Sequence, residues 1–264
     1  MSLEREQVLA EMGLTPQWTL REQPSVARDV KIMPTCDPVS VTPPVVSEKP
    51  LRSDSHTVSS LLVTEDRSDQ LASVGWTEFR QSIAECRACA LCTERQLVVP
   101  GVGDEQADWL FIGEGPGADE DAQGEPFVGA GGQLLDKYLA AVDLDRRTNI
   151  YIANIVKCRP PQNRDPLQEE QEACMDWLRN QTALLRPKII VCLGRIAAMR
   201  IIKPDFKITR EHGQFFKKGN IYMTATLHPA ALLRNPAQKP AAFDDFLKLR
   251  DKIDELQADI SKTY

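Results

Sequence analysis

Residues 109–136 have the sequence WLFIGEGPGADEDAQGEPFVGAGGQLLD, and this stretch decides the fold. It opens with the apolar residues of a buried strand and ends, after Gly131 and Gly132, with the apolar spacing of a helix. Glycines at 113, 115 and 117 form a turn between the two that requires bare backbone. Such a turn places backbone amides at the carboxyl edge of a sheet, where α/β proteins hold their sites.

The acidic residues after this turn limit what it can bind. Glu114, Asp119, Glu120 and Asp121 contribute four carboxylates, and no lysine follows the glycines. The carboxylates would repel a phosphate, which disfavours a phosphate-binding loop. For the glycines alone, a tight turn with a solvated acidic loop is as well supported as a functional site.

Four apolar runs of strand length alternate with helical patterns along the chain. The runs are nearly continuous, as expected for strands that are covered on both faces. The alternation predicts a parallel sheet between two layers of helices, and residues 206–218 interrupt it with a short strand or a loop. The expected strands are residues 109–112, 150–156, 188–193 and 221–227, and the expected helices are residues 132–142, 167–185, 195–201 and 242–256, after a first helix that begins near Trp76.

Composition sets further limits. The chain has 264 residues, of which 42% are hydrophobic, enough for one good core. Its net charge of -6 opposes bulk binding to nucleic acid but is compatible with a local basic patch. No stretch approaches the roughly 18 apolar residues of a membrane span, and the N-terminus lacks an apolar signal. We therefore expect a cytoplasmic protein whose seven cysteines are thiols or metal ligands.

The first 68 residues differ from the rest of the chain. Residues 23–68 are rich in Pro, Ser, Thr and Val without a helical or strand period, which predicts a disordered linker. Residues 1–22 combine a short amphipathic pattern with Trp18 and Leu20, which is typical of a partner-docking peptide or of a frayed terminus. The folded domain is expected to span residues 69–264.

The cysteines suggest a metal centre. Cys86 and Cys89 form a CxxC pair, Cys158 follows the second expected strand, and Cys174 lies in the helix after it. Two such pairs suit a four-coordinate centre, either zinc or a 4Fe–4S cluster. Spacing does not decide between Cys89 and Cys92, and the alternative is that most cysteines are small buried hydrophobic residues.

Polar residues stand at the ends of three expected strands. Glu114, Asn154 and His228 would emerge at the same edge of the sheet, where α/β sites converge, although a histidine before a proline is by itself usually a turn residue. Basic residues in the nearby loops suit contacts with a nucleic-acid backbone, or are ordinary solvated charges. They are Lys157, Arg159, Arg164, Arg234 and Lys239.

Four segments, GEGPGADED, PFVGAGGQLL, YIANIVKCRPPQNR and HPAALLRNP, closely resemble the motifs of the family 4 uracil-DNA glycosylases. The resemblance covers about residues 86–245. It departs at Gly131, where the family usually has alanine, and at Ala231, where the family often has an aromatic residue. It implies a three-layer α/β/α sandwich with a central four-stranded parallel sheet. It also implies hydrolysis of the N-glycosidic bond of uracil in DNA, which leaves an abasic site for base excision repair. The cofactor implied is a 4Fe–4S cluster with ligands at Cys86, Cys89, Cys158 and Cys174.

The residue types suit this reaction. Uracil must be flipped out of the duplex, and Phe127 offers a ring on which the flipped base can stack. The amide of Asn154 matches uracil O4 and N3–H, and His228 with the amide near Gly115 would stabilise the charge left on uracil O2.

The family pattern also puts two carboxylates in the pocket. We expect Glu114 to activate the attacking water and Glu120 to guard the C5 edge of uracil against the methyl group of thymine. Two other classes remain open: a non-catalytic iron–sulfur DNA-binding or redox-sensing protein, and a nucleotide hydrolase that uses the acidic loop with a divalent metal.

The predicted partners are uracil-containing DNA and, through the N-terminus, replication proteins. Within residues 1–22, the segment VLAEMGLTPQWTLRE (residues 8–22) resembles the N-terminal peptide of the psi subunit of the bacterial DNA polymerase III clamp loader, which implies docking on clamp-loader subunits. The linker would then raise the local concentration of the enzyme at that machinery. We expect a monomer associated with the bacterial nucleoid.

Overall fold

The structure is a computed structural model that describes residues 75–261. The predicted docking peptide, residues 1–22, and the predicted linker, residues 23–68, lie outside the described residues. Within residues 75–261, no helix has both the length and the apolar character needed to cross a membrane.

One mixed sheet forms the centre of the domain, with the strand order β1-β3-β2-β4-β6-β5. Its four inner strands are parallel and confirm the predicted four-stranded core. Two short strands, one at each edge, pair antiparallel with their neighbours and extend the sheet beyond that prediction. The strands are β1 (Val102–Gly103), β2 (Trp109–Gly113), β3 (Ile150–Asn154), β4 (Ile189–Leu193), β5 (Phe216–Lys218) and β6 (Ile221–Thr226).

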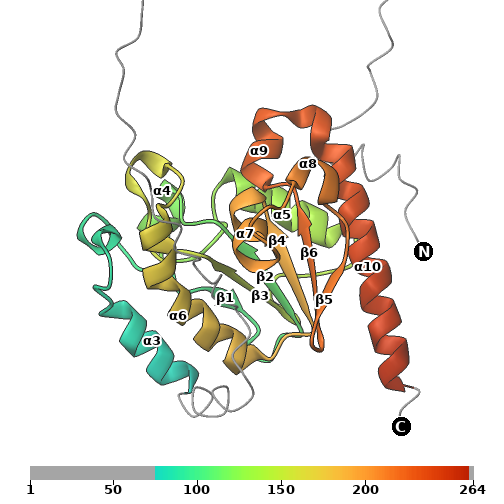
Figure 1. Cartoon of the computed structure of the whole chain (residues 1–264), viewed down its shortest axis with the longest axis horizontal. Coiled ribbons are helices and arrows are strands. Elements are labelled where there is room, and N and C mark those ends of the chain that lie inside the picture. Colours follow the sequence, from blue (N-terminus) through green and yellow to red (C-terminus); the bar gives the residue numbers. More distant parts are fainter. Residues whose placement is uncertain (1–74, 262–264) are drawn as a thin grey trace, which may run out of the picture. The chain divides into compact units, whose positions relative to one another are not determined.

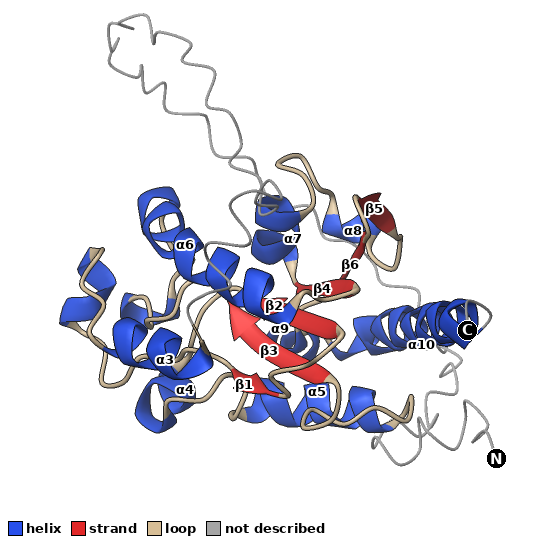
Figure 2. Cartoon of the chain, turned by 90° about the horizontal axis from the view of Figure 1, so that it is seen from below, coloured by secondary structure: helices blue, strands red, loops and turns tan. Residues whose placement is uncertain are grey.

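Helices cover both faces of this sheet and make three layers (Figures 1 and 2). On one face, Leu110 and Ile112 pack in a core with side chains of α6 and α7. On the other face, the Phe111 ring stacks on Phe246 of α10, which in turn stacks on Tyr138 of α5. The helices are α3 (Trp76–Ala84), α4 (Ala118–Gln123), α5 (Ala130–Ala140), α6 (Gln168–Leu185), α7 (Arg195–Ile201), α8 (Ile208–Glu211), α9 (Pro229–Arg234) and α10 (Lys239–Ser261), with 3-10 turns at Ala90–Thr93, Pro161–Asn163 and Pro236–Gln238.

The acidic segment after the glycine turn is a helix, α4, where the sequence predicted a loop. Its six residues are too few to show a period, and its ends explain why it forms. The carboxylate of Glu120 accepts a hydrogen bond from the Gly117 amide at 3.0 Å, which caps the N-terminus, and Gly124 adopts a left-handed conformation at the C-terminus.

The register of the inner strands brings the candidate residues together. Gly113 of β2 lies opposite Asn154 of β3, and pairing continues past the strands through the Val156 amide and the Glu114 carbonyl, at 3.2 Å. On the other side of β2, Leu193 of β4 lies opposite Thr226 of β6, two residues before His228. The carboxyl ends of three parallel strands therefore open onto one site.

Candidate active site

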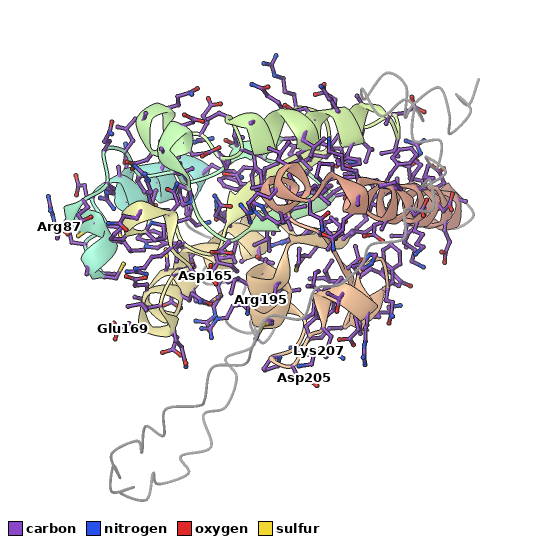
Figure 3. All side chains as sticks on the ribbon, turned by 90° about the horizontal axis from the view of Figure 1, so that it is seen from above. Arg87, Asp165, Glu169, Arg195, Asp205 and Lys207 are labelled. Carbon is purple, nitrogen blue, oxygen red and sulfur yellow. The ribbon has the colours of Figure 1, made fainter. Side chains whose placement is uncertain are left out.

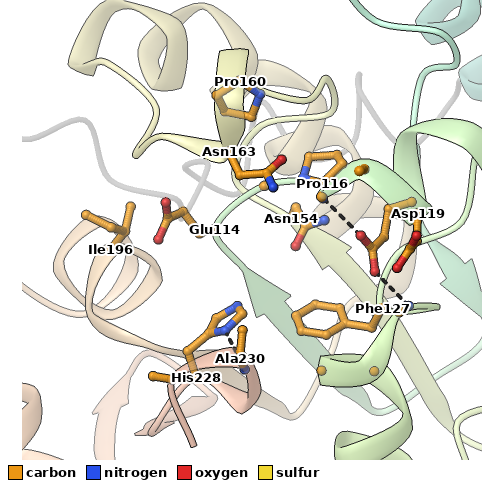
Figure 4. A pocket seen from close by; sticks show the side chains of 18 of the residues that line it. Glu114, Pro116, Asp119, Phe127, Asn154, Pro160, Asn163, Ile196, His228 and Ala230 are labelled. Atoms are coloured by element: carbon orange, nitrogen blue, oxygen red, sulfur yellow. Dashed lines mark hydrogen bonds between the residues drawn. The ribbon is translucent and has the colours of Figure 1, made fainter. Parts of the chain in front are cut away.

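A cavity of about 590 Å³ opens at the carboxyl edge of the sheet. Figure 4 shows Glu114, Asn154, Phe127 and His228 around it, and the first turns of α4, α5, α7 and α9 complete its walls. The three strand-end residues predicted from the sequence thus lie in one pocket, together with the aromatic residue of the loop before α5.

The base-reading candidate, Asn154, is buried with 2% of its surface exposed. Its side-chain oxygen Oδ1 has no hydrogen-bond partner, which is costly for a buried polar atom in the absence of a ligand. The same residue is fixed from behind, since Lys157 Nζ donates to its backbone carbonyl at 2.9 Å. Lys157 therefore holds Asn154 in place, and the Asn154 side chain offers a hydrogen-bond acceptor without a partner to a ligand in the pocket.

Phe127 forms a second wall. Its ring is 7% exposed and lies 5.7 Å from the His228 ring, centroid to centroid, at an interplanar angle of 33°. The edge of the same ring approaches Gly113 so closely that a Cβ there would lie 2.6 Å from it. The cavity thus has an aromatic face next to an amide that can donate and accept.

His228 caps α9 and has a defined protonation state. Its Nδ1 accepts a hydrogen bond from the Ala230 amide at 3.2 Å, so the proton of the neutral ring is on Nε2. Burial, aided by the nearby Arg234 and opposed by Glu120, lowers the pKa of His228 to about 4. At neutral pH the ring is therefore an uncharged N–H donor.

Glu114 lies between opposing charges. Burial raises its pKa to about 7, aided by the adjacent Asp165 carboxylate, with which its side chain is hydrogen-bonded, and opposed by Arg195 and Arg234. Asp165 in turn pairs with Arg195 at 3.1 Å, and Figure 3 shows these two side by side. A carboxyl with a pKa near 7 is matched to proton transfer at neutral pH.

Glu120 lines the pocket, but its carboxylate is already occupied. Its two oxygens accept three backbone hydrogen bonds, from the amides of Gly117, Val128 and Gly129, each at 3.0 Å. These bonds tie α4 to the loop that carries Phe127. Gly115 also lines the pocket, and a Cβ there would be 2.8 Å from a methyl group of Val156, so a side chain at this position would have to displace Val156.

The predicted phosphate-contacting residues fall into two groups. Arg164 and Arg234 line the pocket, whereas Arg159 and Lys239 are half-buried outside it. The prediction for Lys157 is wrong, because its side chain is 1% exposed and lies inside the domain.

The predicted cluster ligands lie together on the far side of Asn154. Cys86, Cys89, Cys158 and Cys174 line one small cavity, and Cys92 lines it too. None of them forms a disulfide. Cys192 lies apart, buried inside β4, as the sequence predicted for a small apolar residue.

The surroundings of these sulfurs suit thiolates. Cys86 Sγ accepts a hydrogen bond from Trp177 Nε1 at 3.2 Å, Cys158 Sγ from Arg95 Nη1 at 3.0 Å, and Cys174 Sγ from a backbone amide at 3.3 Å. Burial raises the pKa of Cys174 to about 11, so a thiolate there requires a bound cation. Soft sulfur donors around one cavity, with N–H groups directed at them, fit a metal centre.

Comparison with known proteins agrees with this geometry. The model of the uracil DNA glycosylase superfamily matches residues 100–249. The type-4 uracil-DNA glycosylase of Archaeoglobus fulgidus is 45% identical over 177 residues, which are 64% of this chain and 88% of the relative. The chain belongs to the type-4 uracil-DNA glycosylases. A second type-4 enzyme, from Thermotoga maritima, is 41% identical over 157 residues, which are 59% of this chain and 81% of that relative.

Two pocket residues of this type-4 family member were not found from the sequence. Asp165 follows a turn and Arg195 opens α7, directly after β4. Arg195 stands at a strand end, as the predicted residues do, so the rule that located Asn154 and His228 would also have located it. No sequence pattern marked Asp165 as a site residue, because the residues that it contacts, Arg195 and Glu114, are distant along the chain.

Proposed function

We propose that this protein flips uracil out of DNA into the pocket at the carboxyl edge of its sheet and hydrolyses the N-glycosidic bond. Its membership of the type-4 uracil-DNA glycosylases carries the reaction class. The observation that carries the substrate is the buried, unpartnered Oδ1 of Asn154, which the N3–H of uracil would satisfy. Cytosine has no hydrogen on N3 and would leave this oxygen without a partner.

Phe127 supports the flipped base. Extrusion costs a few kcal/mol in lost stacking and pairing. A ring fixed beside Asn154 replaces part of the lost stacking, which is worth about 1–3 kcal/mol per base. Phe127 is already positioned for this in the free protein, so little order has to be created on binding.

His228 stabilises the leaving group. As the bond to C1′ breaks, its electron pair stays with the base and negative charge spreads onto uracil O2. The Nε2–H of neutral His228 is the donor available for that oxygen, because Nδ1 is taken by the Ala230 amide. Because the pKa of His228 is about 4, the ring is neutral at pH 7, and a neutral imidazole donates a hydrogen bond through Nε2–H without giving up this proton.

Glu114 activates the water. The ionised carboxylate accepts a proton as the water oxygen bonds to C1′, so the sugar gains a hydroxyl and the base leaves as its anion. Its raised pKa, about 7, makes Glu114 a better base than an ordinary carboxylate while leaving a large fraction ionised at neutral pH.

The four sulfur donors at the cysteine cavity suit a 4Fe–4S cluster. Within residues 75–261, no three Cys, His, Asp or Glu side chains converge as ligands of a single ion. Cys86, Cys89, Cys158 and Cys174 instead line the walls of a cavity, an arrangement that favours a multi-atom cluster over zinc. The cluster would join the loop after α3 to the loop after β3, a structural role.

DNA contacts and partners complete the proposal. Arg195 and Arg234 at the pocket rim are suited to phosphates on either side of the flipped base. Arg164 lies at the same rim and would have to loosen its two hydrogen bonds to Glu170 to make such a contact. Docking of residues 1–22 on clamp-loader subunits and action at the nucleoid remain predictions from the sequence.

A uracil-release assay tests the reaction. Full-length protein should generate alkali-labile abasic sites in a uracil-containing single-stranded oligonucleotide and none in the matched cytosine or thymine oligonucleotides. EDTA should leave the rate unchanged. Absence of uracil release from protein that contains its iron would refute the proposal and favour a non-catalytic iron–sulfur protein. Activity that disappears in EDTA would favour a metal-dependent hydrolase.

A further inference from the structure

The backbone at Phe127 is strained. Its φ is +56°, in the left-handed region that bulky residues avoid. A residue persists in this conformation only where its surroundings impose it, and such residues concentrate at functional sites. Because this ring forms the aromatic wall of the pocket, the contacts that impose its conformation also set the position of the ring.

Arg146 makes the contact that fixes the Phe127 carbonyl. Its Nη2 donates to the Phe127 oxygen at 2.9 Å, across 19 positions of sequence. Its Nε donates to Asp136 Oδ1 on α5 at 2.7 Å, so the guanidinium is anchored at a second point. The arginine is 18% exposed and is absent from the lining of the cavity.

Two further contacts complete the restraint around Phe127. A Cβ on Gly132 would lie 1.7 Å from the Phe127 oxygen, so this carbonyl presses directly against the first turn of α5. On the other side, the next two amides, of Val128 and Gly129, donate to Glu120. Arg146 is the member of this set that lies outside the pocket, and it can be changed without touching a bound base.

We propose that Arg146 is a positioning residue for uracil excision, which acts by holding Phe127 in its left-handed conformation so that the ring can stack on the flipped base. This inference rests on the proposed glycosylase function. An arginine in a loop of a DNA-binding protein would otherwise be assigned to a phosphate, but Arg146 lies outside the pocket lining and its Nε and Nη2 both donate inside the protein.

A double-mutant cycle tests the assignment. The single-turnover rate of uracil release from a single-stranded oligonucleotide is measured for the wild type, Arg146→Ala, Phe127→Ala and the double variant. Arg146→Ala should slow release by about tenfold, within the range expected for a weakened base–aromatic stack. It should cause no further loss in the Phe127→Ala background, because the two residues act as one unit.

A matched control is available on α10. Arg250 also bonds a carboxylate, that of Asp254, and a backbone carbonyl, that of Val142, but lies away from the pocket. Arg250→Ala should retain the wild-type rate. Arg146→Lys, which keeps one donor, should recover part of the lost rate, and it replaces Arg146→Ala in the cycle if the alanine variant does not fold.

The outcomes separate the explanations. Equal losses with and without the Phe127 ring would overturn the proposal, because Arg146 would then act elsewhere. A loss that Arg250→Ala reproduces would mean a general structural effect and would overturn it too. Absence of uracil release from the wild type would instead refute the proposed function, before the role of Arg146 arises.

Discussion

The pH dependence of uracil release depends on Glu114. Its pKa is about 7, raised mainly by burial and then by Asp165. The water-activating form is the ionised one, so the rate should rise with pH through this value. His228, whose pKa is about 4, stays neutral over the same range and therefore adds no second ionisation to the pH–rate profile.

The structure sets the magnitude. With a pKa of about 7, roughly 10% of Glu114 is ionised at pH 6 and roughly 90% at pH 8. A glutamate with the ordinary value of 4.5 would be nearly fully ionised at both. We therefore expect the single-turnover rate to rise about tenfold between pH 6 and pH 8.

The perturbation is Asp165→Asn. It removes the charge that opposes ionisation of Glu114, so the pKa of Glu114 should fall and the profile should move to lower pH. Each profile is normalised to its own plateau, because Asp165 also pairs with Arg195. The matched control is Glu169→Gln, an exposed carboxylate on α6 outside the pocket, which should leave the midpoint unchanged.

Two results would refute this reasoning. A wild-type rate that is flat between pH 6 and pH 8 would mean that Glu114 is not the base. A midpoint that Asp165→Asn leaves in place, or that Glu169→Gln moves equally, would mean that the carboxylate pair does not control it.

Four further expectations concern other parts of the protein. Asn154→Ala and His228→Ala should each slow uracil release by 10²-fold or more, about 2.7 kcal/mol, with little change in DNA affinity measured by fluorescence anisotropy. Glu120→Ala should slow uracil release. If this variant also releases thymine from a thymine oligonucleotide, Glu120 guards the C5 edge of the base; if it releases none, the role of Glu120 is only to support the loop that carries Phe127. Cys174→Ala should abolish absorbance at about 400 nm and lower the melting temperature, whereas replacing Cys36, the cysteine in the predicted linker, should change neither. Deletion of residues 1–22 should leave excision on free DNA unchanged but abolish pull-down of clamp-loader subunits; if full-length protein captures none, the docking peptide is refuted.

The inner sheet could be predicted because each parallel strand is buried on both faces and is therefore a near-continuous apolar run. The edge strand β1 could not, since it has two residues and is partly exposed. The edge strand β5 lies within residues 206–218, where the sequence allowed a short strand or a loop, because three partly exposed residues give too weak a pattern to decide. Helix α4 was missed because its stability comes from Glu120 and Gly124 at its ends rather than from an apolar face.

In the candidate site, too, local features could be predicted from the sequence and long-range contacts could not. Asn154 and His228 were predictable because a strand end is a local feature of the sequence, and the topology of the fold brings such ends together. The raised pKa of Glu114 was not, because it depends on burial and on the neighbouring Asp165, which arise only after the chain has folded. The conformation of Phe127 was not either, because its carbonyl contacts Arg146, which is distant along the chain.

Lys157, predicted as a phosphate contact, instead links the cysteine cavity to Asn154 in the pocket. Its backbone amide donates to Cys174 Sγ at 3.3 Å, while its Nζ donates to the Asn154 carbonyl at 2.9 Å and to Gln181 Oε1 at 2.5 Å. Burial lowers the pKa of its ammonium group to about 8, which leaves it mostly charged at neutral pH with two neutral oxygens as partners. A buried lysine of this kind tolerates little displacement, because either partner would be lost. If the proposed cluster binds at Cys174, its removal should disturb Asn154 through Lys157. Protein from which iron has been removed should therefore release uracil more slowly as well as melt at a lower temperature, and an unchanged rate would contradict this link.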